Sequence, residues 1–181
     1  MLGVKLFYNY TKTRQDNGVN SIDTVKKKIN NWKSGKYLPL TDRAHSVNTF
    51  ILSKLWYKMG SIEFRKGDIE KMISHIKSWM YADCFVKPEE LILFRNINEG
   101  GLGLECIESK AMACLITSFL EMTVNAKFKA NEYLQSLYYY YIEDCGIKKP
   151  SRPPYYSEEF FAIIKEARAE GIDLESLRIK D

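Results

Sequence analysis

The stretch Leu38-Pro-Leu-Thr-Asp-Arg-Ala-His-Ser-Val-Asn-Thr-Phe-Ile-Leu-Ser-Lys-Leu-Trp-Tyr57 decides how the rest of the chain is interpreted. Its apolar residues recur at three- and four-residue spacing, which predicts the buried face of an α-helix: Ala44, Val47, Ile51 and Leu55, widened by Phe50 and Trp56. Thr41 is suited to cap the start of this helix, and Gly60 is expected to end it. Three cations fall outside the apolar face and are expected on another surface: Arg43, Lys54 and Lys58.

Helical patterns also lie on both sides of this stretch. A helix over residues 21–34, capped by Ser21, is predicted by an apolar stripe of Val25, Ile29 and Trp32. The preceding Asn17-Gly18 pair is typical of a turn. After Asp68, a suitable cap, apolar residues predict another helix as far as Met80. Three helices with such faces can bury one another as a small bundle.

Two short regions indicate β-structure. Residues 1–8 alternate in the manner of a strand, and residues 91–104 predict a small β-hairpin that reverses at Gly100-Gly101. Beyond them, helices are expected over residues 108–122 and 127–143. A linker over residues 148–154 then leads to a final helix capped by Ser157. The predicted fold is therefore mainly α: a helical bundle with a short N-terminal strand and a small hairpin, followed by further helices.

The charge of the chain is unevenly distributed. The 181 residues are 45% hydrophobic, which is enough for a core, and they carry a formal net charge of +4. Residues 1–80 contain 15 Lys and Arg against 6 Asp and Glu, whereas residues 81–181 contain 12 against 17. A basic first part fits a polyanionic partner, but surface lysines that keep a protein soluble would give the same pattern. The charge alone leaves both readings open.

No residue pattern is typical of catalysis or metal binding. Four cysteines occur without a CxxC pair, which favours reduced thiols and an intracellular protein of the nucleus or cytoplasm: Cys84, Cys106, Cys114 and Cys145. His45 and His75 lie in helical patterns away from these cysteines. Tyr141-Ile-Glu-Asp144 pairs two carboxylates, but it also lies in a helical pattern. No membrane partner is expected, because no run of about 18 apolar residues occurs.

The opening stretch resembles a known family. Leu-Pro-Leu-Thr-x-Arg-Ala-x-x-Val-Asn-Thr-x-Ile-Leu-Ser-Lys-Leu-Trp-Tyr is similar to the segment just after the polymerase palm in LINE-type (non-LTR) retrotransposon reverse transcriptases. Glu99-Gly-Gly-Leu-Gly-Leu104 is a second match further along the chain, and Leu2-Gly-Val4 resembles the strand that closes the palm. The resemblance implies four parts: a palm remnant (1–20), a thumb-like helical bundle (21–82), a connector with the hairpin and two helices (83–147), and a linker with the C-terminal helix (148–181).

The resemblance also implies what the chain lacks and what it binds. The catalytic Asp-Asp pair of the family, with its Mg²⁺, belongs to a palm region upstream, so neither catalytic residues nor a cofactor are expected here. The family's thumb holds the RNA–DNA template–primer duplex mainly through its backbone. Residues that could make such contacts are Lys26, Lys27, Lys28, Lys33, Lys36, Arg43 and Lys54. Arg43 and Lys54 are favoured because they lie within the match. For Lys26 to Lys28, a solvated helix face is the alternative.

Two functions remain. The first is a truncated fragment of an RNA-directed DNA polymerase of the LINE type, inactive alone, with residual nonspecific binding of an RNA–DNA or other nucleic-acid duplex. The second is a free-standing helical module derived from a transposon, which binds protein through exposed apolar faces.

Overall fold

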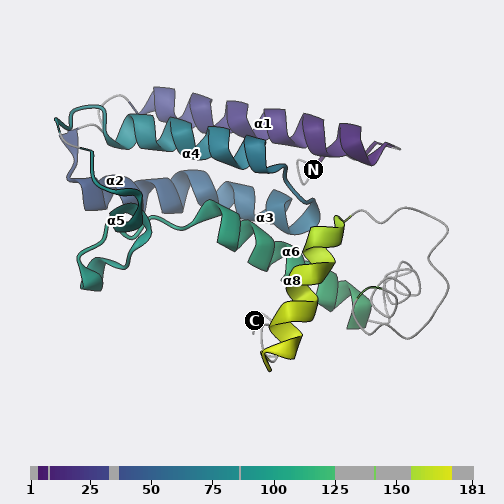
Figure 1. Cartoon of the computed structure of the whole chain (residues 1–181). Helices are drawn as coiled ribbons and strands as arrows, with labels where there is room; N and C mark the ends of the chain where they lie inside the picture. The colour runs from purple at the N-terminus through teal and green to yellow at the C-terminus, as the bar shows by residue number, and fades with distance from the viewer. Residues whose placement is uncertain are drawn as a thin grey trace. The chain divides into compact units, whose positions relative to one another are not determined.

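The computed structural model describes residues 4–7, 9–32, 37–85, 87–124, 141 and 156–172 (Figure 1). These residues are mainly helical, which confirms the predicted fold class, and they contain no strand. The chain divides into two compact units. The first unit comprises Met1–Met59 and Phe64–Ala111, and the second comprises Gly60–Glu63 and Met112–Asp181.

Helices provide almost all of the regular structure. The first unit contains α1 (Tyr10–Asn31), α2 (Leu40–Val47), a π-helical turn η2 (Asn48–Leu52), most of α3 (Ser53–Ser61), α4 (Lys66–Met80), α5 (Glu90–Phe94) and the 3₁₀ turn η3 (Ile97–Glu99). Helix α6 (Ile107–Val124) begins in the first unit, and α8 (Glu158–Ala169) lies in the second. Because α2, η2 and α3 follow one another without a break, we call Leu40–Ser61 the helical rod.

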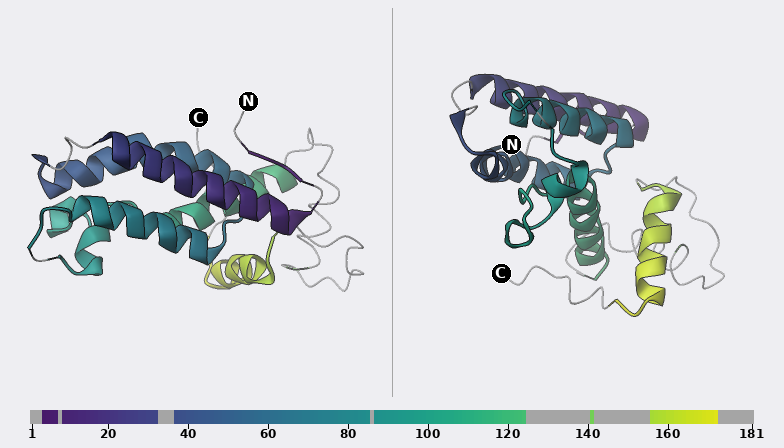
Figure 2. Two further views of the ribbon diagram at one scale, coloured as in Figure 1. Left: turned by 90° about the horizontal axis from the view of Figure 1, so that it is seen from above. Right: turned by 60° about the vertical axis from the view of Figure 1, so that its left-hand side comes forward.

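The core of the first unit lies between α1, α4 and the helical rod, which run side by side (Figures 1 and 2). The predicted stripe of Ala44, Val47, Ile51 and Leu55 is buried, as this prediction required. The core also takes in Val25 of α1 and several residues of α4, among them Met72, Ile76 and Met80. Periodicity thus identified the central stripe of the rod correctly, because large apolar side chains on one face of a helix must be removed from water.

Helix α1 begins much earlier than the sequence suggested. Asn9 caps it, since its side-chain oxygen accepts the N–H groups of Thr11 at 2.9 Å and Lys12 at 3.3 Å. The prediction of a turn at Asn17-Gly18 is wrong, because both residues lie inside the helix. A Cβ atom on Gly18 would lie 2.2 Å from Oδ2 of Asp68, so the absence of a side chain lets α1 approach α4.

The predicted N-terminal strand is not found in residues 4–7, the described part of residues 1–8. Residues 4–7 lie against α1, and side chains of α1 satisfy their backbone. The Asn17 amide accepts the Lys5 N–H at 3.0 Å and donates to the Lys5 carbonyl at 2.7 Å. The Phe7 N–H donates to Oγ1 of Thr13 at 2.9 Å. Backbone groups that would bond to a neighbouring strand in a sheet therefore bond here to side chains of α1.

The predicted hairpin at 91–104 is replaced by α5, η3 and a folded-back loop. Glycine does provide the reversal, since Gly100 and Gly103 adopt positive φ angles of 80° and 67°. The returning backbone bonds to carbonyls of α5, with Leu102 N–H donating to Ile92 at 2.9 Å and Leu104 N–H to Leu93 at 3.0 Å. The apolar residues 91–94 thus form the short helix α5, and the two hydrogen bonds hold the returning loop against it.

Several predicted helix ends are displaced by one or a few residues. The rod begins at Leu40, one residue before Thr41, and continues through Gly60 to Ser61. Helix α4 begins at Lys66, so Asp68 lies in its first turn rather than at its cap. The predicted 108–122 helix is confirmed as α6. The predicted 127–143 helix, apart from Tyr141, and the 148–154 linker lie outside the described residues.

The second unit is built on aromatic packing. Phe119 of α6 meets the rings of Tyr156, Phe160 and Phe161 edge to face, with ring centroids 5.1 to 5.7 Å apart. The predicted cap of α8 is confirmed, since Oγ of Ser157 accepts the Phe160 N–H at 3.1 Å. Glu63 accepts the Ser157 N–H at 2.8 Å, which connects residues 60–63 to the start of α8.

The close approach at Gly18 gives a stability prediction. In an exposed helix, Gly→Ala stabilises by about 1 kcal/mol. We expect Gly18→Ala instead to destabilise the protein by about 1–3 kcal/mol, because the new methyl group overlaps the Asp68 carboxylate. Denaturant unfolding measures the change. In an Asp68→Ala background the same substitution should become neutral or stabilising, and a loss of the same size there would contradict the explanation.

Candidate nucleic-acid interface

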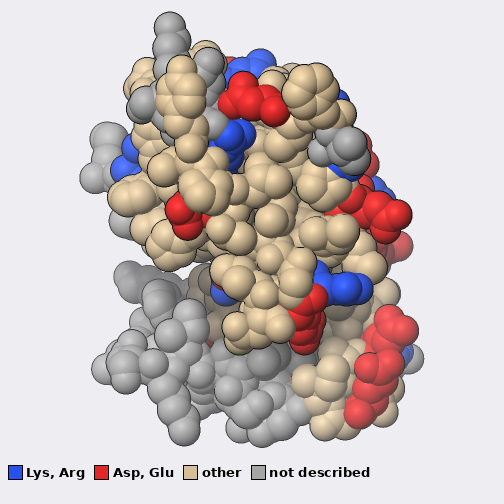
Figure 3. Space-filling model, turned by 90° about the vertical axis from the view of Figure 1, so that its left-hand side faces the viewer, with Lys and Arg blue, Asp and Glu red and all other residues tan. Residues whose placement is uncertain are grey.

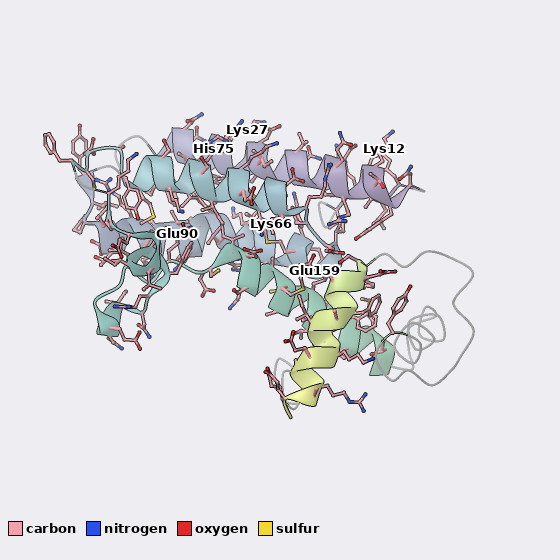
Figure 4. All side chains as sticks on the ribbon, in the orientation of Figure 1. Lys12, Lys27, Lys66, His75, Glu90 and Glu159 are labelled. Atoms are coloured by element: carbon pink, nitrogen blue, oxygen red, sulfur yellow. The ribbon has the colours of Figure 1, made fainter. Side chains whose placement is uncertain are left out.

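The lysines singled out in the sequence lie on two elements of the first unit. Lys26, Lys27 and Lys28 lie in the last turns of α1, where Figure 4 labels Lys27, and Lys54 lies in α3. The Lys26, Lys27 and Lys54 side chains are exposed, and Lys28 is half-buried. We call these four residues the lysine seam. Lys33 and Lys36 lie outside the described residues.

The fold brings Lys28 and Lys54 together, although they are far apart in sequence. The Lys54 side chain lowers the pKa of Lys28, first as a hydrogen-bonding partner and then as a neighbouring like charge, with a smaller effect of burial. Two ammonium groups this close to each other repel. An anion bound to both would relieve this repulsion. The remaining seam lysines, Lys26 and Lys27, precede Lys28 on α1.

Aromatic packing fixes this approach. One helical turn beyond Lys28, the Trp32 ring meets Phe50 edge to face at 5.4 Å between centroids. Phe50 lies one turn before Lys54, so α1 and the rod run in opposite directions here. Trp32 also contacts Trp79 of α4 at 5.9 Å, and its carbonyl accepts the Trp79 Nε1–H at 3.3 Å. These contacts hold the end of α1 against the rod and α4, one helical turn from the lysine pair.

Two exposed aromatic side chains flank Lys54 on the rod. Phe50 is 52% exposed and Tyr57 is 51% exposed, at positions four residues before and three after this lysine. Phe50 was expected in the buried face, and that expectation is wrong. The π-helical turn at Asn48–Leu52 inserts an extra residue per turn and so changes which side chains follow the buried stripe. Exposed aromatic rings beside cations provide surfaces on which bases can stack.

Asn48, at the start of this turn, binds a distant segment of the unit. Its side-chain nitrogen donates to the Gly103 carbonyl at 2.8 Å, and its oxygen accepts the Glu105 N–H at 3.0 Å. The segment after η3 is thereby held against the rod. Sequence patterns gave no sign of this role, because an asparagine in a helical stretch reads only as a weak helix former.

Arg43 has a structural position. It is only 5% exposed, and its Nε and Nη1 groups donate to the carbonyls of Leu38 at 2.9 Å and Met80 at 2.7 Å. Its Nη2 group lies 3.5 Å from Oδ2 of Asp83, whose side chain is exposed. The guanidinium group is thus engaged within the first unit, and we do not place it on the surface with the lysine seam.

The charges around the seam are locally unbalanced. Within the described part of the chain, no carboxylate forms an ion pair with Lys26, Lys27, Lys28 or Lys54. The face shown in Figure 3 carries Lys and Arg among Asp and Glu, with no single broad basic field.

Other kinds of site find no support among the described residues. They contain no group of three or more His, Cys, Asp or Glu side chains that could hold a metal ion. No helix in the described ranges is long and apolar enough to cross a membrane. Comparisons with protein-family models, curated proteins and solved structures find no match to this chain. The similarity to LINE-type reverse transcriptases therefore stays a prediction from the sequence.

The position of Arg43 predicts a loss of stability on truncation. Arg43→Ala should destabilise the protein by about 2–4 kcal/mol, because the buried carbonyl of Met80 and the part-buried bond to Leu38 both lose a charged donor. Denaturant unfolding measures this loss. The matched control is Lys54→Ala on the same rod, which should change stability by no more than about 0.5 kcal/mol. A stable Arg43→Ala protein that fails to bind duplex would instead place Arg43 in the interface.

The lysine pair predicts a change in titration. Lys54→Met should raise the pKa of Lys28 toward its ordinary value, because both the hydrogen-bonding partner and the like charge are removed. The lowered pKa means that the folded protein holds this proton less tightly than the unfolded chain. The repulsion therefore opposes folding at neutral pH and is lost as the pH rises through the pKa of Lys28. Side-chain NMR through the alkaline range measures this pKa, which Lys66→Met should leave unchanged.

Proposed function

We propose that the first unit binds the sugar–phosphate backbone of a nucleic-acid duplex, without sequence preference, through the lysine seam. The observation that carries this proposal is the approach of Lys28 to Lys54, which lowers the pKa of Lys28. The contacts of Trp32 with Phe50 and Trp79 join α1 to the rod and to α4 one helical turn away from this pair. A phosphate between them gains two charge-assisted hydrogen bonds and removes their repulsion.

The chemistry of the seam favours backbone contacts over base contacts. Lysine presents a compact point charge on a flexible stem, which suits phosphate, whereas the planar fork of arginine is the group best suited to bidentate contacts. Affinity would come from release of counterions and would fall steeply with salt. The exposed rings of Phe50 and Tyr57 beside Lys54 add surfaces on which an unpaired or terminal base can stack.

The resemblance supports an RNA–DNA duplex as the partner. Lys54, Phe50 and Tyr57 all belong to the stretch 38–57 that is similar to the segment after the palm in LINE-type reverse transcriptases. We propose accordingly that the first unit is thumb-like and that the chain derives from such an enzyme. The proposal concerns binding only, and the chain is not expected to polymerise DNA by itself.

Protein binding is the second candidate. It is favoured by the exposed apolar side chains where the chain enters the rod, Tyr37 and Leu38, and by Phe50 further along. Such a module would bind its partner with little dependence on salt, because burial of apolar surface and not charge would drive association. Salt dependence therefore separates the two candidates.

The test is binding of a fluorescent RNA–DNA duplex to the full chain, measured by anisotropy over a series of salt concentrations. Lys28→Glu/Lys54→Glu is compared with Lys66→Glu/Lys71→Glu, which makes the same change of charge at exposed positions on α4. We expect steep salt dependence, and the seam variant should lower the slope of log K against log salt by about 2. The α4 variant should keep the slope of the unaltered protein.

Two outcomes would contradict the proposal. Equal losses in the two charge variants would mean that net charge, and not the seam, governs binding. No binding at low salt by a protein that still unfolds cooperatively would leave protein binding as the better candidate.

A further inference from the structure

A cleft of about 1040 Å³ lies in the first unit beside α4, at the edge of the core, to which Tyr81 belongs and against which Ile73 and Cys84 pack. Its wall on α4 consists of residues at one face of the helix, including Glu70, Ser74 and Ser78, and it continues to Tyr81 just after the helix. From Glu70 to Tyr81 such a face extends about 16 Å. The lining residues outside α4 include Lys87 and Glu90, the latter labelled in Figure 4, and Glu108 at the start of α6.

A buried hydroxyl group in the wall has no hydrogen-bonding partner in the part of the chain that the structure describes. Tyr81 is only 7% exposed, and no hydrogen-bonding group among the described residues reaches its hydroxyl oxygen. A buried polar group without a partner is costly, so native proteins rarely leave one unless something else binds there. Burial raises the pKa of Tyr81, and the charges of Cys84 and Glu90 raise it further. The hydroxyl therefore keeps its proton and can donate as well as accept.

The charge of the cleft differs from that of the unit around it. The two segments of the first unit contain 18 Lys and Arg against 11 Asp and Glu. Among the residues that line the cleft, three glutamates face two lysines. Lys77 is paired with Glu90 at 2.5 Å, which leaves Glu70 and Glu108 against Lys87. An otherwise basic unit thus has a locally acidic cleft, which complements a cation.

We propose that this cleft binds an extended peptide segment that carries a lysine or arginine side chain. The length of about 16 Å matches about five residues of extended chain at about 3.3 Å each. A peptide backbone offers both donors and acceptors, which suit the Tyr81 hydroxyl and the serines of α4. The basic side chain lies between Glu70 and Glu108. The volume, at or above the usual range of about 300–1,000 Å³ for small ligands, also suits a segment of chain.

The test titrates the isotope-labelled full chain with the peptide acetyl-Ala-Ala-Lys-Ala-Ala-amide and follows the backbone signals of Ser74, Ser78 and Tyr81 by NMR. The matched probe replaces its Lys by Gln, and n-butylammonium tests a small cation alone. We expect the Lys peptide to shift these signals at lower concentrations than either control. Equal binding of the Gln peptide would overturn the role of charge, and equal binding of n-butylammonium would overturn the role of the peptide.

Variants locate the contacts. Glu70→Gln/Glu108→Gln should weaken binding of the Lys peptide about threefold to tenfold, whereas Asp42→Asn/Glu99→Gln, at exposed carboxylates outside the cleft, should not. No effect of the first pair would overturn the site.

Tyr81→Phe separates binding from folding. It removes a hydroxyl group without an internal partner, so the free protein should melt no earlier than the unaltered one. Peptide affinity should nevertheless fall about twofold to tenfold. A lower melting temperature would mean that the hydroxyl serves the fold, which would contradict the proposal.

Discussion

The first unit depends on one buried cation. Arg43 donates to the carbonyl of Leu38, where the chain enters the rod, and to that of Met80, at the end of α4. The last carbonyl groups of a helix lack partners within that helix, so an arginine that reaches Met80 supplies what α4 cannot. The charge has been removed from water, and these bonds are what offset that cost. The start of the rod and the end of α4 are thereby fixed together, and the rod that carries Lys54 and the wall that continues to Tyr81 both extend from this point.

Two asparagines explain how a mainly helical unit accommodates irregular segments. Asn17 pairs with both backbone groups of Lys5, and Asn48 pairs with the backbone at Gly103 and Glu105. A side-chain amide carries one acceptor and two donors in nearly the geometry of a peptide group, so it can take the place of a neighbouring strand. Each segment satisfies its hydrogen bonds against a helix. This is why residues 4–7 do not form a strand: the partner of their backbone is a side chain of α1 and not a sheet.

Features that depend on residues close together in the sequence could be predicted, whereas features that depend on residues far apart in the sequence could not. The stripe of Ala44, Val47, Ile51 and Leu55 and the Ser157 cap depend on residues a few positions apart, and both were predictable. The need for a glycine at position 18 could not be predicted, because it arises from the close approach of Asp68, which is distant in sequence. Phe50 followed the apolar pattern, but the π-helical turn placed it at the surface. The four described seam lysines were identified from the sequence, yet only the fold shows that Lys28 meets Lys54, that Arg43 is buried and that Tyr81 lines a cleft.

The pairing of α1 with α4 also has a consequence for the order of events during synthesis. The Arg14 side chain bonds to the carbonyl of Phe64 across 50 positions, and Trp79 bonds to Trp32 across 47. Contacts between residues so distant in sequence close large loops, which slows folding. Until the ribosome has synthesised α4, the apolar face of α1 cannot be buried against it. Exposed apolar faces of this kind promote aggregation. The nascent chain therefore passes through a vulnerable interval, which ends only when the residues around Trp79 have left the ribosome.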